Sequence, residues 1–223
     1  SVIEGIFKSK LKIKKIYISP RNRLISNKLR KKFKKVSVSK NNQQLVDMVN
    51  WVFLAVTPKV GNKILKNLNF KSKHKIVSFI STINLEKLKK YTNNKKVTRV
   101  IPMPFIGIKK GPIIICPKDT KVKKFFDKLG TTIEIKNEKI SKNFWTTSSF
   151  MAPFYQIMAT TSDWLVRKGV KRKAAEKYSR EFFLALSQDS IFKNKLSLKQ
   201  LVSESQTPGG INAQALRELK KKK

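Results

Sequence analysis

Apolar positions in the first two thirds of the chain alternate between short extended runs and stripes at helical spacing. The run at 51–56 is continuously apolar, which is typical of a strand buried on both faces of a parallel sheet. Residues 2–7 place Val2, Ile3, Ile6 and Phe7 on one face of a helix. Further strands are predicted at 14–19, 35–39, 75–80, 97–101, 113–116 and 131–135. Further helices are predicted at 24–33, 43–48, 61–68, 85–91 and 122–129. This alternation predicts an α/β fold built on a doubly wound parallel sheet.

The pattern changes after about residue 136, where strand signals stop and longer helical stripes begin. One apolar stripe runs from Phe150 to Leu165 and ends near Gly169, and a second runs through 174–185. Ser197 can cap a short helix, and Asn212 can cap a last helix at 213–220. We therefore expect an α/β domain over 1–137 and an all-helical domain over 138–223.

The chain is strongly basic, with 51 Lys and Arg residues against 13 Asp and Glu residues and a net charge of +38. Such a charge attracts polyanions and suggests a nucleic-acid partner. Lysine accounts for 43 of the basic residues and arginine for only 8, although a surface that reads bases favours arginine. Because Ile and Asn are also abundant, a composition set by AT-rich coding is the alternative explanation of the charge. A lysine-coated enzyme is the favoured interpretation.

The single cysteine and the single histidine limit the chemistry that the chain can perform. One cysteine excludes a disulfide framework and a cysteine-based metal cluster. Cys116 follows three isoleucines and is predicted to lie in the core. His74 lies in a lysine-rich segment and is predicted to be a surface residue. No apolar run reaches the length of a membrane span, and a cytoplasmic protein is expected.

The most specific motif is the stretch 203–216, which reads Ser-Glu-Ser-Gln-Thr-Pro-Gly-Gly-Ile-Asn-Ala-Gln-Ala-Leu. Pro-Gly-Gly predicts a tight turn directly before a helix N-terminus. Free backbone amides and the helix dipole at that position can bind a carboxylate. An ordinary turn between two helices remains the alternative.

The motif resembles the C-terminal segment of the pyrroline-5-carboxylate reductases, and other segments resemble that family in the same order. They are Val52-Phe53-Leu54-Ala55-Val56-Thr57-Pro58, Ile76-Val77-Ser78-Phe79-Ile80, Arg99-Val100-Ile101-Pro102-Met103-Pro104, Ser149 with Pro153 and Tyr155, and Gly169-Val170 with Arg172 and Ala175. The resemblance covers nearly the whole chain. It implies an NAD(P)-binding Rossmann domain and a helical domain that forms a homodimer or a larger homo-oligomer.

The resemblance also implies an activity, the transfer of a hydride from NADPH to the C=N carbon of a cyclic imino acid in proline biosynthesis. Thr207, Gly209, Gly210 and Asn212 would bind the substrate, with Asn212 and Thr207 as the catalytic candidates. The segment Ala55-Val56-Thr57-Pro58 would line the nicotinamide. No metal is expected.

The choice of cofactor is predicted from the residues after the second strand of the Rossmann domain, where an acidic residue would bind a ribose hydroxyl. This chain has Ser19-Pro20-Arg21-Asn22-Arg23 there and no acid. Ser19, Arg21 and Asn22 are therefore the expected contacts of an NADPH 2′-phosphate, with NADH possible. Membership of Arg21 and Arg23 in the general basic coat is the alternative.

Three departures from the family pattern affect this interpretation. The glycine fingerprint and its strand are absent, so we expect about a dozen residues upstream of Ser1 and poor dinucleotide binding by the chain alone. Asn212 stands where the family usually has threonine, and Pro102-Met103-Pro104 lacks an Asn-Thr pair. Two alternatives remain, a reductase of the same fold for another imine, and a basic nucleic-acid-binding or regulatory protein on a decayed Rossmann scaffold.

Overall fold

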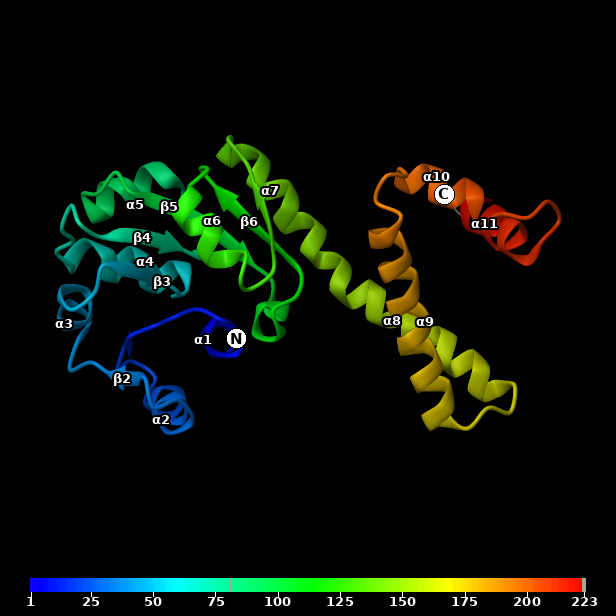
Figure 1. Ribbon diagram of the computed structural model, residues 1–223, viewed down its shortest axis with the longest axis horizontal. Coiled ribbons are helices and arrows are strands. Elements are labelled where there is room, and N and C mark those ends of the chain that lie inside the picture. The colour runs from blue at the N-terminus through cyan, green and yellow to red at the C-terminus, as the bar shows by residue number, and fades with distance from the viewer. Residues whose placement is uncertain (81, 222–223) are drawn as a thin grey trace. The chain divides into compact units, whose positions relative to one another are not determined.

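The computed structural model describes residues 1–80 and 82–221, which form two compact units, Ser1–Ser148 and Ser149–Lys223 (Figure 1). The first unit alternates strands and helices, and the second is helical. The strands are β1 (Ile16–Ile18), β2 (Val36–Val38), β3 (Trp51–Leu54), β4 (Lys75–Ser78), β5 (Val97–Pro102), β6 (Pro112–Cys116) and β7 (Thr131–Glu134). The helices of this unit are α1 (Val2–Lys8), α2 (Arg23–Lys32), α3 (Asn42–Asp47), α4 (Pro58–Ile64), α5 (Leu85–Thr92), α6 (Thr120–Phe126) and α7 (Glu138–Thr147), with short 3-10 turns η1 (Leu65–Asn67) and η2 (Pro104–Ile108).

The strands of the first unit form two sheets within the described residues. β1 and β2 pair in parallel, and a five-stranded sheet has the order β3-β4-β5-β6-β7. The pairs β3–β4, β4–β5 and β6–β7 are parallel, whereas β5 and β6 are antiparallel. The predicted parallel sheet is thus interrupted at one position. A parallel connection requires a crossover of a dozen or more residues, and the nine residues 103–111 between β5 and β6 are too few.

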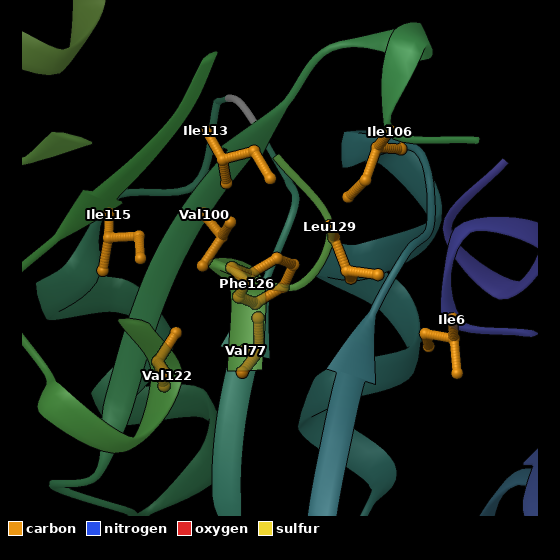
Figure 2. Close-up of a cluster of buried hydrophobic side chains, with 9 residues drawn as sticks. All are labelled: Ile6, Val77, Val100, Ile106, Ile113, Ile115, Val122, Phe126 and Leu129. Carbon is orange, nitrogen blue, oxygen red and sulfur yellow. The ribbon is translucent and has the colours of Figure 1, made fainter. Parts of the chain in front are cut away.

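Both faces of the five-stranded sheet bury apolar side chains, because successive residues of a strand point to opposite faces. On one face, Val77 and Val100 pack with Phe126 of α6 (Figure 2). On the other face, Ile76 and Val97 pack with helix and turn residues such as Leu88. The predicted two-sided burial around 51–56 is confirmed, since Val52 and Leu54 belong to one cluster and Trp51 and Phe53 contact the other.

The second unit consists of helices that contact one another over a limited surface. It contains the 3-10 turn η3 (Ser148–Phe150), which starts at the unit boundary, and α8 (Met151–Arg167), α9 (Arg172–Phe192), α10 (Leu198–Glu204) and α11 (Ile211–Lys221). α8 and α9 form an antiparallel hairpin at Gly169, whose φ is +91°. Ser197 caps α10 with a complete capping box, as predicted. Asn212 does not cap the last helix, because α11 already begins at Ile211.

Most large apolar side chains of the second unit are exposed. Ala175 is its only buried hydrophobic residue among the described positions. The exposed set includes Phe150, Phe154, Tyr155, Ile157, Trp164, Tyr178, Phe182, Leu184, Leu186, Ile191, Phe192, Leu198 and Ile211. Exposed apolar side chains in this number are typical of an interaction site. None of the helices in the described part of the chain is long and apolar enough to cross a membrane.

Candidate functional site

The residues predicted to bind the adenosine end of a cofactor lie directly after β1. The Ser19 hydroxyl donates to Asn42 Oδ1 at 2.8 Å and accepts from the Arg21 N–H at 3.3 Å. Asn22 is the N-cap of α2, and its Oδ1 accepts from Ile25 N at 3.0 Å. The first turn of α2 contains no acidic residue. The exposed Arg21 side chain and the amide end of α2 together form a donor set that suits an anion.

The residues predicted to line the nicotinamide lie directly after β3. Ala55 and Thr57 are exposed, and Thr57 is the N-cap residue of α4, with Pro58 at the first helical position. The backbone Gly61 N–H donates to Thr57 O at 2.8 Å. In open α/β sheets, ligands bind outside the carboxyl ends of the parallel strands. Ser19 to Asn22 and Ala55 to Pro58 each follow the carboxyl end of a parallel strand.

The predicted substrate-binding residues lie in the turn between α10 and α11, in the second unit. Gly209 has a φ of +72°, which favours glycine, and Gly210 N donates to Thr207 O at 2.8 Å. Asn212 Nδ2 donates to Ser205 O at 2.9 Å, so part of its amide holds the turn. The first N–H groups of α11 have no acceptor inside the helix, because no preceding turn exists.

Gln214 supplies a second side-chain amide to this turn. Its Nε2 donates to Gly209 O at 3.0 Å, next to the Asn212 contact with Ser205 O. The turn is therefore stabilised by two side-chain amides, those of Asn212 and Gln214, as well as by the positive φ of Gly209. The Pro-Gly-Gly motif predicts the turn, but it does not predict these two hydrogen bonds.

Sequence reasoning missed a buried ion pair next to the carboxyl end of β4. Arg99 of β5 is 6% exposed and contacts Glu138 Oε1 at 2.5 Å. Its guanidinium also donates to Ile80 O at 3.4 Å, while Glu138 accepts from Leu85 N at 2.9 and 3.1 Å. The only signal in the sequence was one arginine inside an apolar strand. A charged side chain buried at such a position requires a partner of opposite charge.

A second ion pair lies at the amino end of the same strands. Lys75 Nζ contacts Asp119 Oδ2 at 2.5 Å, and Asp119 caps α6 by accepting from Lys121 N and Val122 N. Burial acts to raise the pKa of Asp119, but the hydrogen bonds from Lys75 and the two amides outweigh it and lower the pKa below 3.8. This pair joins β4 to α6 on the side of the sheet away from the predicted cofactor residues.

The surface position predicted for His74 is wrong, because its side chain is fully buried. His74 Nδ1 accepts from Lys71 N at 2.9 Å, and the ring lies edge-on to Phe70. Burial first, and then the charges of Lys73 and Lys71, lower the pKa of His74 below 6.5. The imidazole is thus a neutral structural acceptor that closes a loop.

The core position predicted for Cys116 is confirmed, with 1% of the residue exposed. Burial, and then the charge of Glu138, raise the pKa of the Cys116 thiol. A protonated, buried thiol is a poor nucleophile. No group of three or more His, Cys, Asp or Glu residues that could hold a metal ion occurs in the described part of the chain.

Comparison with family models matches both parts of the chain. Residues 1–85 match the model described as NADP oxidoreductase coenzyme F420-dependent. Residues 138–223 match the model described as pyrroline-5-carboxylate reductase dimerisation. No curated protein matches the sequence.

Solved structures share this fold. The 1-pyrroline-5-carboxylate reductase from Streptococcus pyogenes is 21% identical, with 99% of this chain and 85% of that chain covered and a TM-score of 0.78. The Plasmodium falciparum pyrroline carboxylate reductase with NADP bound is 20% identical over the same shares, with a TM-score of 0.80. An imine reductase from Aspergillus terreus is 10% identical over 92% of this chain and 74% of that chain, with a TM-score of 0.60.

A Rossmann-like NADP-binding unit with a parallel sheet, followed by a helical dimerisation segment, defines an NADP-dependent reductase. The predicted fold class is confirmed by these matches. The helical segment 138–223 belongs to the pyrroline-5-carboxylate reductase dimerisation family, and residues 1–85 belong to an NADP oxidoreductase family.

Proposed function

We propose that the protein reduces a cyclic imino acid with NADPH, and that pyrroline-5-carboxylate is its substrate. The single observation that carries the proposal is the turn Thr207–Gly210 before α11. Gly209 adopts a positive φ, and side-chain amides hold the carbonyls of Ser205 and Gly209. The first N–H groups of α11 are thereby left for an anionic ligand, and a carboxylate is the anion that such a substrate carries.

The turn residues have separate proposed roles. Thr207 and the amides that follow Gly209 and Gly210 bind the carboxylate, because hydroxyl and N–H donors stabilise an anion. Asn212 faces the imine nitrogen with the part of its amide that Ser205 O does not use. Asn212 and Thr207 are the proposed catalytic residues, since both would touch the substrate.

The donor set after β1 fits a phosphate and supports NADPH over NADH. Arg21 would pair with the 2′-phosphate, while Ser19 and Asn22 shape the loop that presents it. The segment Ala55–Pro58 would lie along the nicotinamide. When bound, NADPH supplies the hydride and its electron pair to the C=N carbon. The nitrogen retains the proton that the iminium substrate brings, so the chain needs no separate acid.

We also propose that the protein acts as a homodimer, or a larger homo-oligomer, in the cytoplasm. The support is the match of 138–223 to a dimerisation family together with the exposed apolar side chains of α8 and α9. A second copy of the same helices would cover these side chains.

The test of the activity uses the protein expressed from its complete reading frame. NADPH oxidation is followed at increasing pyrroline-5-carboxylate, with a six-membered cyclic imino acid and a cyclic imine without a carboxylate as comparison substrates. We expect the five-membered imino acid to have the highest kcat/KM. A preference for the imine without a carboxylate would reject the assigned turn, and no oxidation with any imine would reject the reductase activity.

Substitution of Asn212 tests its proposed contact with the substrate. Asn212→Ala should lower kcat/KM by about tenfold or more, because a hydrogen bond to a charged group contributes about 1.5–3 kcal/mol. Asn194→Ala, at an exposed asparagine after α9, is the matched control. An unchanged rate in Asn212→Ala would remove this residue from the site.

The choice of cofactor is tested at Arg21. Arg21→Ala should raise the KM for NADPH by about tenfold and leave the KM for NADH nearly unchanged, because only NADPH carries the paired phosphate. Arg30→Ala, near the other end of α2, controls for the loss of one positive charge. An equal effect of both substitutions would assign Arg21 to the general basic coat.

A different imino acid is the second candidate substrate. Asn212 replaces the threonine of the family pattern, and Pro102-Met103-Pro104 lacks its Asn-Thr pair. Both changes would alter the surroundings of the imine ring. A higher kcat/KM for the six-membered imino acid would favour this candidate.

A further inference from the structure

The ion pair Arg99–Glu138 holds both ends of one short segment at the carboxyl end of β4. The Arg99 guanidinium donates to Ile80 O, two residues after β4 ends. The Glu138 carboxylate accepts from Leu85 N, the first residue of α5. Because Arg99 and Glu138 also bind each other at 2.5 Å, the two ends of the segment are tied through a single cluster.

Two isoleucines of this region, Ile80 and Ile83, pack against α4, the helix that follows the proposed nicotinamide residues. Ile80 and Ile83 are each 2% exposed and belong to the same core cluster as Leu54. A Cβ placed on Gly61 would lie 3.0 Å from Ile80 Cδ1, 3.2 Å from Ile83 Cδ1 and 3.6 Å from Val56 Cγ2. The backbone of α4 therefore rests directly on these two isoleucines.

These contacts form a continuous path from the ion pair to the residues after β3. Arg99 fixes the backbone of Ile80, and the Ile80 side chain supports Gly61. Gly61 N in turn donates to Thr57 O at 2.8 Å. The first two steps join the buried residues Arg99, Ile80 and Gly61, which transmit displacement because packed interiors yield little. The last step is a hydrogen bond to the carbonyl of the exposed Thr57.

We propose that Arg99 and Glu138 are positioning residues for the loop Ala55–Pro58, acting through Ile80, Ile83 and Gly61. Glu138 is also the first residue of the segment that matches the dimerisation family. The cluster thus joins the start of that segment to the loop proposed to bind the nicotinamide. This proposal rests on the proposed function for the role of the loop, although the contacts themselves do not.

The carboxylate of the second ion pair provides a matched control. Glu138→Gln and Asp119→Asn each remove one negative charge from a largely buried pair at 2.5 Å and keep the side-chain shape. Only the first pair touches the segment under the loop, whereas the second lies at the amino end of the strands. Loss of stability is expected in both variants, and displacement of the loop only in Glu138→Gln.

The first measurement is hydrogen exchange of the backbone amides of residues 55–64 in the complete protein. We expect faster exchange there, by about tenfold, in Glu138→Gln than in Asp119→Asn when the two variants are compared at equal global stability. Equal exchange in this segment would overturn the proposal. This readout needs no substrate, so it stays informative if the reductase activity is absent.

The second measurement is the split between kcat and KM. Glu138→Gln should lower kcat by about tenfold with little change in the KM of the imino acid, because a displaced loop misplaces the reacting groups. Asp119→Asn should leave both constants near those of the wild type. An equal loss of kcat in the two variants would mean that the Arg99–Glu138 pair contributes only to general stability and does not position the loop.

Gly61→Ala approaches the same path from its other end and covers the case in which Glu138→Gln does not fold. The added methyl would press on Ile80 and Ile83 without touching the ion pair. It should speed exchange at 55–64, and in Glu138→Gln/Gly61→Ala the combined effect should be smaller than the product of the single effects. The proposed path would be rejected if the two substitutions changed the exchange rates at 55–64 independently in the double variant. It would also be rejected if Gly61→Ala exchanged at the wild-type rate there.

Discussion

The two units of the molecule use apolar residues in opposite ways. The first unit places them in two clusters on the faces of its sheet, where Phe126, Ile76 and Leu88 are fully buried. The second unit exposes Phe182, Leu184 and many others along its helices. The first unit therefore has a core of its own, whereas the second has an apolar surface that a partner would bury. The difference separates a segment whose apolar residues form a core from a segment whose apolar residues are available for association.

The largest expected effect lies in the core of the first unit. Phe126 contacts Phe79, Phe53 and Phe125 edge-on, with ring centroids 5.1–6.4 Å apart. Phe126→Ala should reduce the free energy of unfolding of this unit by about 3–5 kcal/mol, at any protein concentration. Phe192→Ala, at a side chain 84% exposed in α9, is the control and should cost less than about 0.5 kcal/mol there. Urea titration at two protein concentrations measures both losses. If the loss in Phe126→Ala depended strongly on protein concentration, the first unit would not owe its stability to a core of its own.

The second effect concerns association through the helical unit. Tyr178 and Phe182 stack on α9 at 5.9 Å, and Phe182 is 43% exposed. Phe182→Glu would bury an unpaired charge in the proposed interface, which costs about 3 kcal/mol, or about a hundredfold in the dissociation constant. Sedimentation velocity measures the shift, with Glu181→Gln on the same helix as the control. A dimer of unchanged affinity would place the interface elsewhere.

A smaller effect is expected from pH in the first unit. The pKa of His74 is lowered from 6.5 by burial and by Lys73 and Lys71, so the unfolded chain takes up the proton first as the pH falls. The free energy of unfolding should therefore be unaffected by His74 above pH 6.5 and should fall below it, by at most about 1.4 kcal/mol per pH unit, until the folded-state pKa is reached. His74→Gln keeps an acceptor for Lys71 N and should lack this part of the slope.

The measurement is the difference between the wild type and His74→Gln in urea titrations at pH 7.5 and 5.5, which cancels the titration of carboxylates shared by both. Equal pH slopes in the two proteins would mean that His74 gains its proton in the folded state as readily as in the unfolded chain. His74 would then make no pH-dependent contribution to the stability of the first unit.

The smallest effect is expected at an ion pair of the helical unit. Arg172 contacts Asp163 between the start of α9 and the end of α8, and the two side chains are 54% and 48% exposed. Asp163→Asn should change the free energy of unfolding by less than about 0.5 kcal/mol, because water screens exposed pairs. A loss above about 1 kcal/mol in thermal unfolding would show that the hairpin depends on this contact.

Local patterns predicted most of the elements, because strand and helix periods are properties of neighbouring residues. They did not predict the direction of β6, which is set by the short connection 103–111. They also misplaced His74, since the lysines around it suggested solvent while Phe70 and the Lys71 N–H surround the ring.

The site was predictable to a different extent in each part. Pro208-Gly209-Gly210 indicated a turn at the N-terminus of a helix, and the turn is present. The pairing of Arg99 with Glu138 joins residues 39 positions apart, and no periodic pattern links them. Such contacts depend on the order of the strands, which a single sequence specifies only through the whole fold. The assignment of these residues to substrate and cofactor remains a prediction.

The hairpin of α8 and α9, closed at Gly169, affects the order of events during refolding. Its contacts join segments that are adjacent in the chain, and local contacts form faster than the parallel strand pairs of the first unit, which require long crossovers. We therefore expect the apolar faces of the hairpin to form while the sheet is still incomplete and to be exposed to other chains. A net charge of +38 opposes such encounters by mutual repulsion, which salt screens.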